Sequence, residues 1–302
     1  MSPLPSPPTP LPHTGEGRSQ RLRPVVNWNI VGGCNYRCSY CVQKHAEGVG
    51  GPDDARLDAG LDCLCALPGA WEIKISGGEP FLLKRLPEVA AHLATAGHKV
   101  SILTNLSPSL AVIERFVTAA SDRLRTFSCS LHLEQVSVAD FLAKAIAVEQ
   151  LLRALPRATF VVNFVVQPGK VRQAAELRRQ FEAAGLKFYP QLMRVNGAPA
   201  HYGLIDRFHL RRAFADLAGP GAMNRGYSHL GKPCHAGQYY FIIHPKGDAY
   251  TCYPGKRTGQ GYLGNIFDGS LQLTDGLLCP YPVCPCTVPQ NRGIVQKEAG
   301  SS

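Results

Sequence analysis

The stretch "VVNWNIVGGCNYRCSYCVQ", residues 25–43, joins a strand-like run to three closely spaced cysteines. Its first seven residues are mostly β-branched or aromatic, as is typical of a buried strand. Cys34, Cys38 and Cys41 fall within the loop that follows. A zinc site or a closed four-iron cluster normally takes four protein ligands, so three cysteines predict a metal centre with one open position.

The alternation of strand and helix continues along the chain. Further strand-like runs lie at residues 72–76, 99–105, 125–131, 159–166 and 186–193. Helical spacing follows each strand, at residues 53–67, 82–97, 109–120, 137–155, 171–185 and about 205–218. Gly97 and Gly185 are expected to be C-caps. Six successive βα units predict an α/β fold, a partial (β/α)6 barrel of the TIM type that binds ligands at the carboxyl ends of its strands.

The pattern predicts four segments. Residues 1–23 are rich in Pro, Ser and Thr and are expected to form a disordered leader. The barrel is assigned to residues 24–219. Residues 220–290 contain a predicted β-hairpin at 239–253, which turns at "PKGD", and are rich in cysteine. A domain this small needs a metal staple or docking against the barrel. Residues 291–302 are expected to be a flexible tail.

Composition narrows the functional class. The chain has 302 residues, of which 45% are hydrophobic, and it contains no apolar run of the roughly 18 residues that a membrane span requires. Eleven cysteines without a signal peptide favour metal or redox chemistry in the cytoplasm over a disulfide framework. The formal charge of +10 suggests an anionic ligand or an acidic electron-donor protein. Aromatic and basic residues do not interleave, so no nucleic acid is expected as a partner. The lack of a long apolar run predicts no membrane partner.

The spacing C-x3-C-x2-C of Cys34, Cys38 and Cys41, with Tyr40 before the last cysteine, resembles the signature of the radical S-adenosylmethionine (radical SAM) superfamily. The resemblance implies that the three thiolates hold a [4Fe-4S] cluster whose open iron binds SAM. It further implies reductive cleavage of SAM to a 5′-deoxyadenosyl radical, which abstracts a hydrogen atom from the substrate. The electron would come from a protein such as flavodoxin or ferredoxin.

A second motif, "ISGGEPFL" at residues 75–82, resembles the GGEP element of the same family. By this resemblance Gly77, Gly78, Glu79 and Pro80 line the amino acid moiety of SAM, and Glu79 offers a carboxylate to its ammonium group. Other positions that match contacts of relatives with SAM are Tyr40, Asn105, Ser130, Gln191 and Arg194.

A second group of cysteines lies near the C-terminus, in "PCHAGQYYFIIHPKGDAYTC" (233–252) and "CPYPVCPC" (279–286). This segment resembles the Twitch and SPASM domains, which implies an auxiliary [4Fe-4S] cluster. The candidate ligands are Cys234, Cys252, Cys279, Cys284 and Cys286. Five thiols suffice for one cluster but not for the two of a complete SPASM domain, so the Twitch form is expected. The spacing leaves open which four bind.

Zinc is the alternative for both groups, as a knuckle completed by His45 at the first and as a zinc ribbon at the second. Cys63, Cys65 and Cys129 are expected to be small buried hydrophobes. Cys129 is also a speculative donor of a hydrogen atom to the substrate.

The candidate catalytic residues are His132 and Glu134 in "SLHLEQ", with Cys129. His132 and Glu134 follow a strand at alternate positions and are expected to project into the cavity, the alternative being a solvated loop. Tyr189, His201 and Tyr202 are further expected lining residues.

The predicted function is hydrogen abstraction from a polar small molecule that is a sugar, nucleotide or amino acid derivative, leading to dehydrogenation or epimerisation. A radical SAM peptide maturase is the alternative enzyme, and a zinc-stapled SAM-binding module is the non-enzyme alternative.

Overall fold

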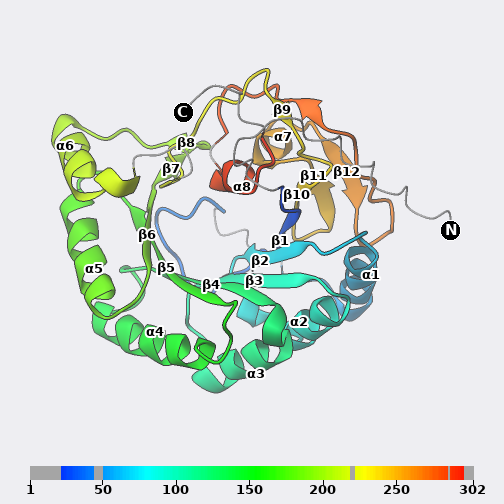
Figure 1. The fold of residues 1–302 in the computed structure, drawn as a ribbon, viewed down its shortest axis with the longest axis horizontal. Helices are drawn as coiled ribbons and strands as arrows, with labels where there is room; N and C mark the ends of the chain where they lie inside the picture. Colours follow the sequence, from blue (N-terminus) through cyan, green and yellow to red (C-terminus); the bar gives the residue numbers. More distant parts are fainter. Residues whose placement is uncertain (1–21, 44–49, 218–221, 285, 296–302) are drawn as a thin grey trace.

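The computed structural model describes residues 22–43, 50–217, 222–284 and 286–295. The predicted leader up to residue 21, the predicted tail from residue 296 and His45 lie outside the described residues. The start of the predicted tail is described, and Ile294 and Val295 in it are buried. Six βα units follow one another, which confirms the α/β class and the partial barrel (Figure 1). The strands are β1 (Val25–Val31), β2 (Glu72–Gly77), β3 (Lys99–Thr104), β4 (Leu124–Leu131), β5 (Thr159–Val166) and β6 (Phe188–Leu192). The helices are α1 (Asp54–Cys65), α2 (Leu86–Thr95), α3 (Leu110–Ala120), α4 (Val138–Leu152), α5 (Val171–Ala183) and α6 (Leu204–Ala213).

Local chemistry sets several of these boundaries. Helix α2 begins later than the spacing predicts because Pro80–Leu82 form a separate 3-10 turn, η1, and Pro87 fits the first turn of the helix. Gly97 and Gly185 have φ angles of 89° and 79° just after α2 and α5, as expected of C-caps. Two further 3-10 turns, η2 (Ser121–Arg123) and η3 (Ala215–Leu217), follow α3 and α6.

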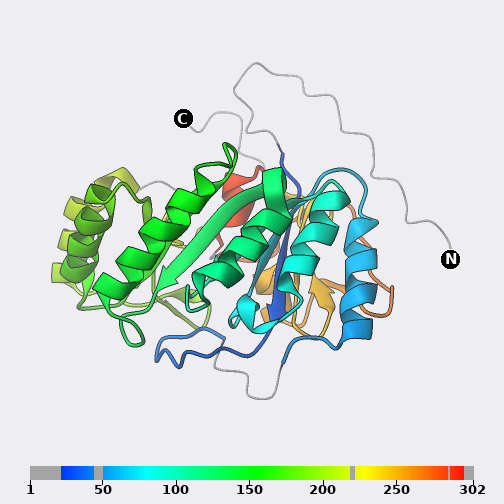
Figure 2. The ribbon, with the colours of Figure 1, turned by 90° about the horizontal axis from the view of Figure 1, so that it is seen from below.

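The helices α1 to α5 form an arc on the outer face of the parallel sheet (Figures 1 and 2). The apolar core lies between the helices and the strands, where Val26, Trp28, Ile30, Ile73 and Ile75 are fully buried. Since side chains alternate along a strand, the intervening residues of β1 and β2 face the inside of the barrel. The barrel interior therefore receives polar side chains from strands that are otherwise apolar.

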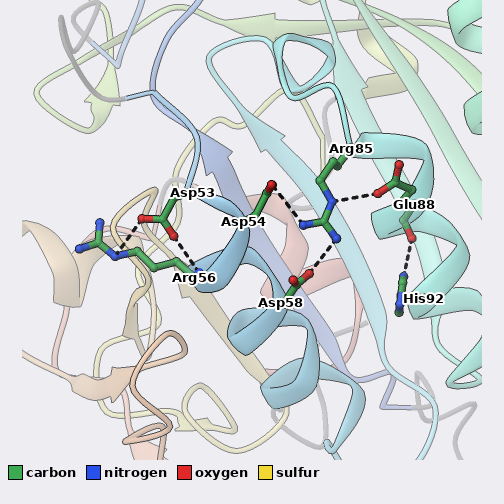
Figure 3. Close-up of polar contacts among 7 residues, drawn as sticks. All are labelled: Asp53, Asp54, Arg56, Asp58, Arg85, Glu88 and His92. Carbon is green, nitrogen blue, oxygen red and sulfur yellow. Dashed lines mark hydrogen bonds and ion pairs between the residues drawn. The ribbon is translucent and has the colours of Figure 1, made fainter.

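An ion network on the outer surface joins α1 to α2 (Figure 3). The guanidinium of Arg85 donates to Asp58 and Glu88 at 2.8 Å each and to Asp54 at 3.2 Å. These three carboxylates raise the pKa of Arg85 above its ordinary value. The network ties Arg85, the N-cap residue of α2, to Asp54 and Asp58 of α1 and to Glu88 of α2.

The C-terminal strands extend the barrel sheet. β10 (Tyr240–Ile243) and β11 (Asp248–Tyr250) form the predicted hairpin, and β12 (Tyr262–Asn265) pairs with β11. β10 runs parallel to β1, with Val25 opposite Tyr240 and Trp28 opposite Ile243. The nine-stranded sheet therefore has the order β12-β11-β10-β1-β2-β3-β4-β5-β6, and the hairpin docks on the barrel by strand pairing, a contact that the sequence pattern does not reveal.

The remaining elements are short. They are β7 (Arg194–Val195), β8 (Ala198–Pro199), β9 (Pro233–Cys234), β13 (Leu277–Leu278), α7 (Tyr253–Arg257) and α8 (Thr287–Asn291). The side chain of Thr287, at the start of α8, lies beside the hydroxyl of Tyr189 on β6, while the neighbouring Cys286 lies beside Tyr240 on β10. The start of α8 therefore reaches both flanks of the partial barrel. Within the described ranges, no helix combines the length and the apolar composition needed to cross a bilayer.

Candidate functional site

The loop after β1, residues 32–43, is called the cluster loop here. Cys34, Cys38 and Cys41 line one cavity at the carboxyl ends of the barrel strands, with a volume of about 1070 Å³ that includes space open to solvent. The cavity also receives the following residues singled out by the sequence: Tyr40, Gly77, Gly78, Asn105, Ser130, His132, Gln191 and Arg194. Residues from β1 to β6 thus meet where the fold class predicts a ligand site.

The three thiols influence one another. Burial raises the pKa of Cys34, and the neighbouring Glu79 and Cys41 raise it further. Burial and the charges of Glu134, Cys41 and Cys34 raise the pKa of Cys38 to about 11. Cys34 and Cys38 therefore keep their protons until a metal replaces them.

The donor set fits an iron-sulfur cluster. Among the described residues, no three His, Cys, Asp or Glu side chains converge tightly enough for a single metal ion. A zinc ion needs its ligands within about 2.0–2.3 Å of one centre, whereas each thiolate of a [4Fe-4S] cluster binds a different iron. Three cysteines that line one cavity can each supply a thiolate to a different iron of such a cluster.

The GGEP turn lies directly against the base of the cluster loop. The Gly78 amide donates to the Val31 carbonyl at 2.8 Å, and the Glu79 amide donates to the Gly33 carbonyl at 2.9 Å. A Cβ at Gly78 would lie 1.8 Å from the Gly33 oxygen, and Gly77 has a φ of 133°. The two glycines therefore allow a backbone approach that no side chain permits.

The carboxylate of Glu79, which the sequence suggests as a partner of SAM, has protein partners in the structure. Its carboxylate is buried and accepts hydrogen bonds from Thr104 Oγ1 at 2.8 Å, the Asn105 amide at 2.7 Å and the Phe81 amide at 3.1 Å. Neither Glu79 nor Pro80 lines the cavity. Glu79 ties the GGEP turn to the end of β3, so contacts from this turn to SAM would come from the main chain of Gly77 and Gly78.

Two of the polar residues expected to contact SAM already bind protein atoms. Asn105 Nδ2 donates to Asn35 Oδ1 at 2.8 Å and lies 3.8 Å from Cys34 Sγ. Gln191 donates to Asn163 at 3.0 Å and accepts from Asn224 at 2.9 Å. Asn105 therefore supports the cluster loop, and Gln191 is fixed at the cavity wall.

Other expected lining residues have structural partners. Tyr189 Oη accepts from the Met223 amide at 3.0 Å, and Tyr202 Oη donates to the Val166 carbonyl at 2.5 Å. His201 is exposed. None of these three lines the cavity.

The candidate catalytic residues are distributed differently from the expectation. Cys129 is fully buried in the apolar core, on the opposite face of β4 from Ser130, and does not line the cavity. This placement argues against Cys129 as a hydrogen donor.

His132 and Glu134 both reach the cluster loop. His132 Nδ1 lies 2.9 Å from Tyr40 Oη, and Glu134 accepts from the Ser39 amide at 2.7 Å and from Ser39 Oγ at 2.6 Å. Both side chains therefore contact the cluster loop.

Electrostatics agree with these contacts. Burial lowers the pKa of His132 to about 4, so its ring is neutral near pH 7. The Ser39 hydrogen bonds hold the pKa of Glu134 below its ordinary value. Glu134 is thus an ionised acceptor on the protein surface.

Four of the five C-terminal cysteines line one small cavity, called the thiol pocket here. They are Cys234, Cys252, Cys279 and Cys284. Burial raises the pKa of Cys234 and Cys284 to about 12 each, and neighbouring thiols contribute in the same direction. Cys286 does not line this pocket, and its Sγ lies 3.8 Å from Tyr240 Oη instead.

Cys286 belongs to a set of polar side chains inside the barrel, called the inner polar group here. Its members are Asn27, Asn29, Lys74, Ser76, Tyr240, Tyr253 and Cys286. Asn27 Nδ2 donates to Tyr240 Oη at 3.2 Å, and Ser76 Oγ donates to Asn29 Oδ1 at 2.9 Å. Burial raises the pKa of Tyr253 to about 12, while the side chains of Asn29 and Asn27 face its hydroxyl.

None of the sequence motifs described above contains this group as a whole. A signal for it exists in the sequence, because Asn27, Asn29, Lys74 and Ser76 alternate with fully buried apolar residues in β1 and β2. Polar residues at alternate positions of a strand whose other face is buried in the core indicate a second face with a different environment.

Known proteins support the cluster-loop assignment. The model of the radical SAM superfamily matches residues 28–160, from β1 to the start of β5. An S-adenosylmethionine-dependent nucleotide dehydratase of Psychrobacter lutiphocae is 33% identical over 27% of this chain and 32% of its own length. A GTP 3′,8-cyclase of Stenotrophomonas maltophilia is 38% identical over 30% of this chain and 28% of its own length. The chain thus spans about a third of the length of the curated relatives it matches.

Two solved structures share the fold. Streptococcus suis SuiB bound to S-adenosylmethionine has a TM-score of 0.62 and 17% identity, covering 82% of this chain and 64% of its own. anSMEcpe with bound AdoMet has a TM-score of 0.58 and 16% identity, covering 81% of this chain and 77% of its own.

Proposed function

Because the radical SAM superfamily model matches residues 28–160, we propose that the chain is a radical SAM enzyme that reductively cleaves SAM to a 5′-deoxyadenosyl radical and abstracts a hydrogen atom from a polar small molecule. One observation carries the proposal, the meeting of Cys34, Cys38 and Cys41 with Gly77 and Gly78 in one cavity. The [4Fe-4S] cluster, when bound, supplies the electron for cleavage and the open iron for SAM.

The chain's own residues supply binding and shelter. The three thiols hold the cluster, and the main chain of Gly77 and Gly78 offers the amino acid part of SAM a surface without side chains. Ser130, Gln191 and Arg194 also line this cavity. A radical needs a site that excludes water and holds the target hydrogen close.

We also propose an auxiliary [4Fe-4S] cluster of the Twitch type in the thiol pocket. Four cysteines line this pocket, which is the number that a closed cluster requires. The proposal assigns Cys234, Cys252, Cys279 and Cys284 as ligands and leaves Cys286 out.

The inner polar group supports an anionic substrate. Glu72 pairs with both Lys74 at 3.7 Å and Arg292 at 2.6 Å, so two cations share one buried carboxylate. Burial lowers the pKa of Lys74. Arg194 adds positive charge near Tyr253. Burial disfavours the charged form of Lys74, and a carboxylate or phosphate of the substrate beside it would stabilise that form.

Two reaction types, dehydrogenation and epimerisation, differ in what they require of the protein. Dehydrogenation would pass an electron to the auxiliary cluster, whereas epimerisation would return a hydrogen atom from a thiol. Cys286 replaces Cys129 as the candidate hydrogen donor, because its thiol faces polar side chains. The nucleotide names of two relatives agree with an anionic small molecule.

Anaerobic reconstitution tests the proposal. We expect about eight irons per chain, and release of 5′-deoxyadenosine when dithionite and SAM are added. Replacing Cys34, Cys38 and Cys41 together with alanine should abolish this release while the auxiliary irons stay bound. A zinc-loaded protein that leaves SAM intact would refute the enzyme assignment.

Acid and neutral pairs of candidate substrates test the substrate class, for example a nucleoside 5′-monophosphate and its nucleoside. We expect the acid to stimulate 5′-deoxyadenosine formation in the wild type and in Lys84→Met, an exposed control. Lys74→Met should lose the stimulation but keep slow SAM cleavage without substrate. If only the neutral compound of each pair stimulates 5′-deoxyadenosine formation, the proposal of an anionic substrate is wrong. The proposal that the protein cleaves SAM would still stand.

A further inference from the structure

The segment between the second and third cysteines of the cluster loop is held from outside the loop. Ser39 and Tyr40 are the two residues between Cys38 and Cys41, and both bind side chains that follow β4. Glu134 uses one carboxylate oxygen for the Ser39 amide, at 2.7 Å, and the other for Ser39 Oγ, at 2.6 Å. Both oxygens of one carboxylate are therefore committed to one residue of the loop.

This contact is local in its effect. Glu134 is exposed and belongs to no apolar cluster, so the barrel core does not depend on it. Hydrogen bonds to an ionised acceptor are shorter and stronger than neutral ones, and the two O···N and O···O distances agree with this. The charge of Glu134 acts on the loop conformation and not on the packing of the fold.

The first half of the loop has its own anchor. Asn35 Nδ2 donates to Ser107 Oγ at 2.9 Å, and Asn35 Oδ1 accepts from Asn105 Nδ2 at 2.8 Å. Residues after β3 therefore hold the loop beside Cys34, and Glu134, after β4, holds it between Cys38 and Cys41. Fixing a loop in advance removes an entropic cost from the step that later binds a group to it.

We propose that Glu134 is a positioning residue, which with Ser39 fixes the Cys38–Cys41 segment in the arrangement that receives the [4Fe-4S] cluster. The inference rests on the proposed cluster site and is independent of the substrate. It replaces the catalytic role that the sequence suggests for Glu134, since the carboxylate is occupied by the loop.

The first test uses cluster-free protein. Hydrogen exchange of a peptide spanning the cluster loop should be about tenfold faster in Glu134→Ala than in the wild type, because two hydrogen bonds to a charged group are lost. The neighbouring exposed residue provides the control, and Gln135→Ala should match the wild type. The thermal unfolding midpoint should be the same in all three proteins. Equal loop exchange in Glu134→Ala and Gln135→Ala would overturn the proposal.

The second test measures how firmly the cluster is held. After reconstitution, a chelator should remove the SAM-site irons severalfold faster from Glu134→Ala and Ser39→Ala than from the wild type, while the auxiliary irons leave at an unchanged rate. Glu134→Gln should restore part of the retention, because its amide oxygen still accepts from the Ser39 amide. Equal iron retention in all variants would refute the positioning role.

The two proposals fail in distinguishable ways. If the wild type binds no cluster and leaves SAM intact, the proposed function fails, whatever the exchange data show. If the wild type cleaves SAM and Glu134→Ala keeps both loop protection and iron retention, only the positioning role fails.

Discussion

Cys286 Sγ lies 3.8 Å from Tyr240 Oη, inside the barrel and outside the pocket that collects the other four C-terminal cysteines. Cys284 and Cys286 are two residues apart, yet the chain directs one to the thiol pocket and the other to the inner polar group. Neighbouring cysteines in this sequence therefore have different surroundings, and different roles are expected of them.

Matched serine variants should separate the two roles. We expect Cys284→Ser to lose about four of eight irons or to hold them loosely, because a closed cluster would lack one ligand. Cys286→Ser should keep the full iron content. Iron analysis and electron paramagnetic resonance of the reduced protein make the comparison, and iron loss in Cys286→Ser with retention in Cys284→Ser would reverse the assignment.

Gly78 should not tolerate a side chain. Its Cβ would lie 1.8 Å from the Gly33 carbonyl oxygen, so Gly78→Ala must separate the GGEP turn from the cluster loop. We expect a loss of about 3 kcal/mol in the free energy of unfolding and no SAM cleavage. Gly50→Ala is the control, since nothing lies within 4 Å of its Cβ. Denaturant unfolding of cluster-free protein gives the comparison, and a Gly78→Ala protein as stable as the wild type would contradict the geometry.

The ion pair between Arg292 and Glu72 should contribute far more to the free energy of unfolding than ion pairs on the surface do. Glu72 has only 5% of its side chain exposed, and Arg292 has 17%. Arg292→Ala leaves a buried carboxylate without its nearest cation, so we expect a loss of about 3 kcal/mol in the free energy of unfolding. The exposed pair of Arg179 and Glu176 supplies the control, and Arg179→Ala should change this free energy by less than about 0.5 kcal/mol. Adding Glu72→Gln to Arg292→Ala should recover part of the loss.

Acid should destabilise the protein through His98. This side chain is fully buried and its Nδ1 accepts from the Trp71 amide at 3.2 Å. Burial lowers the pKa of His98 below its ordinary 6.5, so the unfolded chain takes up the proton first. The stabilisation is complete above about pH 6.5 and falls below it, by up to about 1.4 kcal/mol per pH unit for one group.

The measurement is denaturant unfolding of cluster-free protein between pH 5 and 7.5. His132, His229 and His244, whose pKa values burial also lowers, act in the same direction. His98→Asn should therefore reduce the pH dependence without abolishing it. An unchanged slope in His98→Asn would show that His98 does not titrate in this window.

The order of strands and helices was predictable because each unit has its own periodicity. The six strands lie where β-branched and aromatic residues cluster, and Gly97 and Gly185 end α2 and α5 as their φ angles require. The pairing of β10 with β1 was not predictable, because residues 240–243 and 25–28 are far apart in the sequence. The sequence of a buried strand indicates that it pairs with other strands, but it does not identify which strands they are.

The candidate site also has a part that the sequence predicts and a part that it does not. Spacing located Cys34, Cys38, Cys41, Gly77 and Gly78, which all line the cavity. The direction of the Glu79 and Glu134 side chains depends on donors from other parts of the chain. These donors are Thr104 and Asn105 at the end of β3 and Ser39 in the cluster loop. For that reason the sequence suggested ligand or catalytic roles for carboxylates that the fold uses to hold loops.

The position of β1 between β2 and β10 has a mechanical consequence. Hydrogen bonds hold β1 on both sides along Val25–Trp28, so the hairpin cannot shift without carrying the start of β1 with it. The cluster loop leaves the other end of that strand, and Tyr253, which faces the barrel interior, follows the hairpin. The two cysteine-rich regions are therefore both attached to strand β1. We expect the distance between them to stay constant while substrate enters and product leaves.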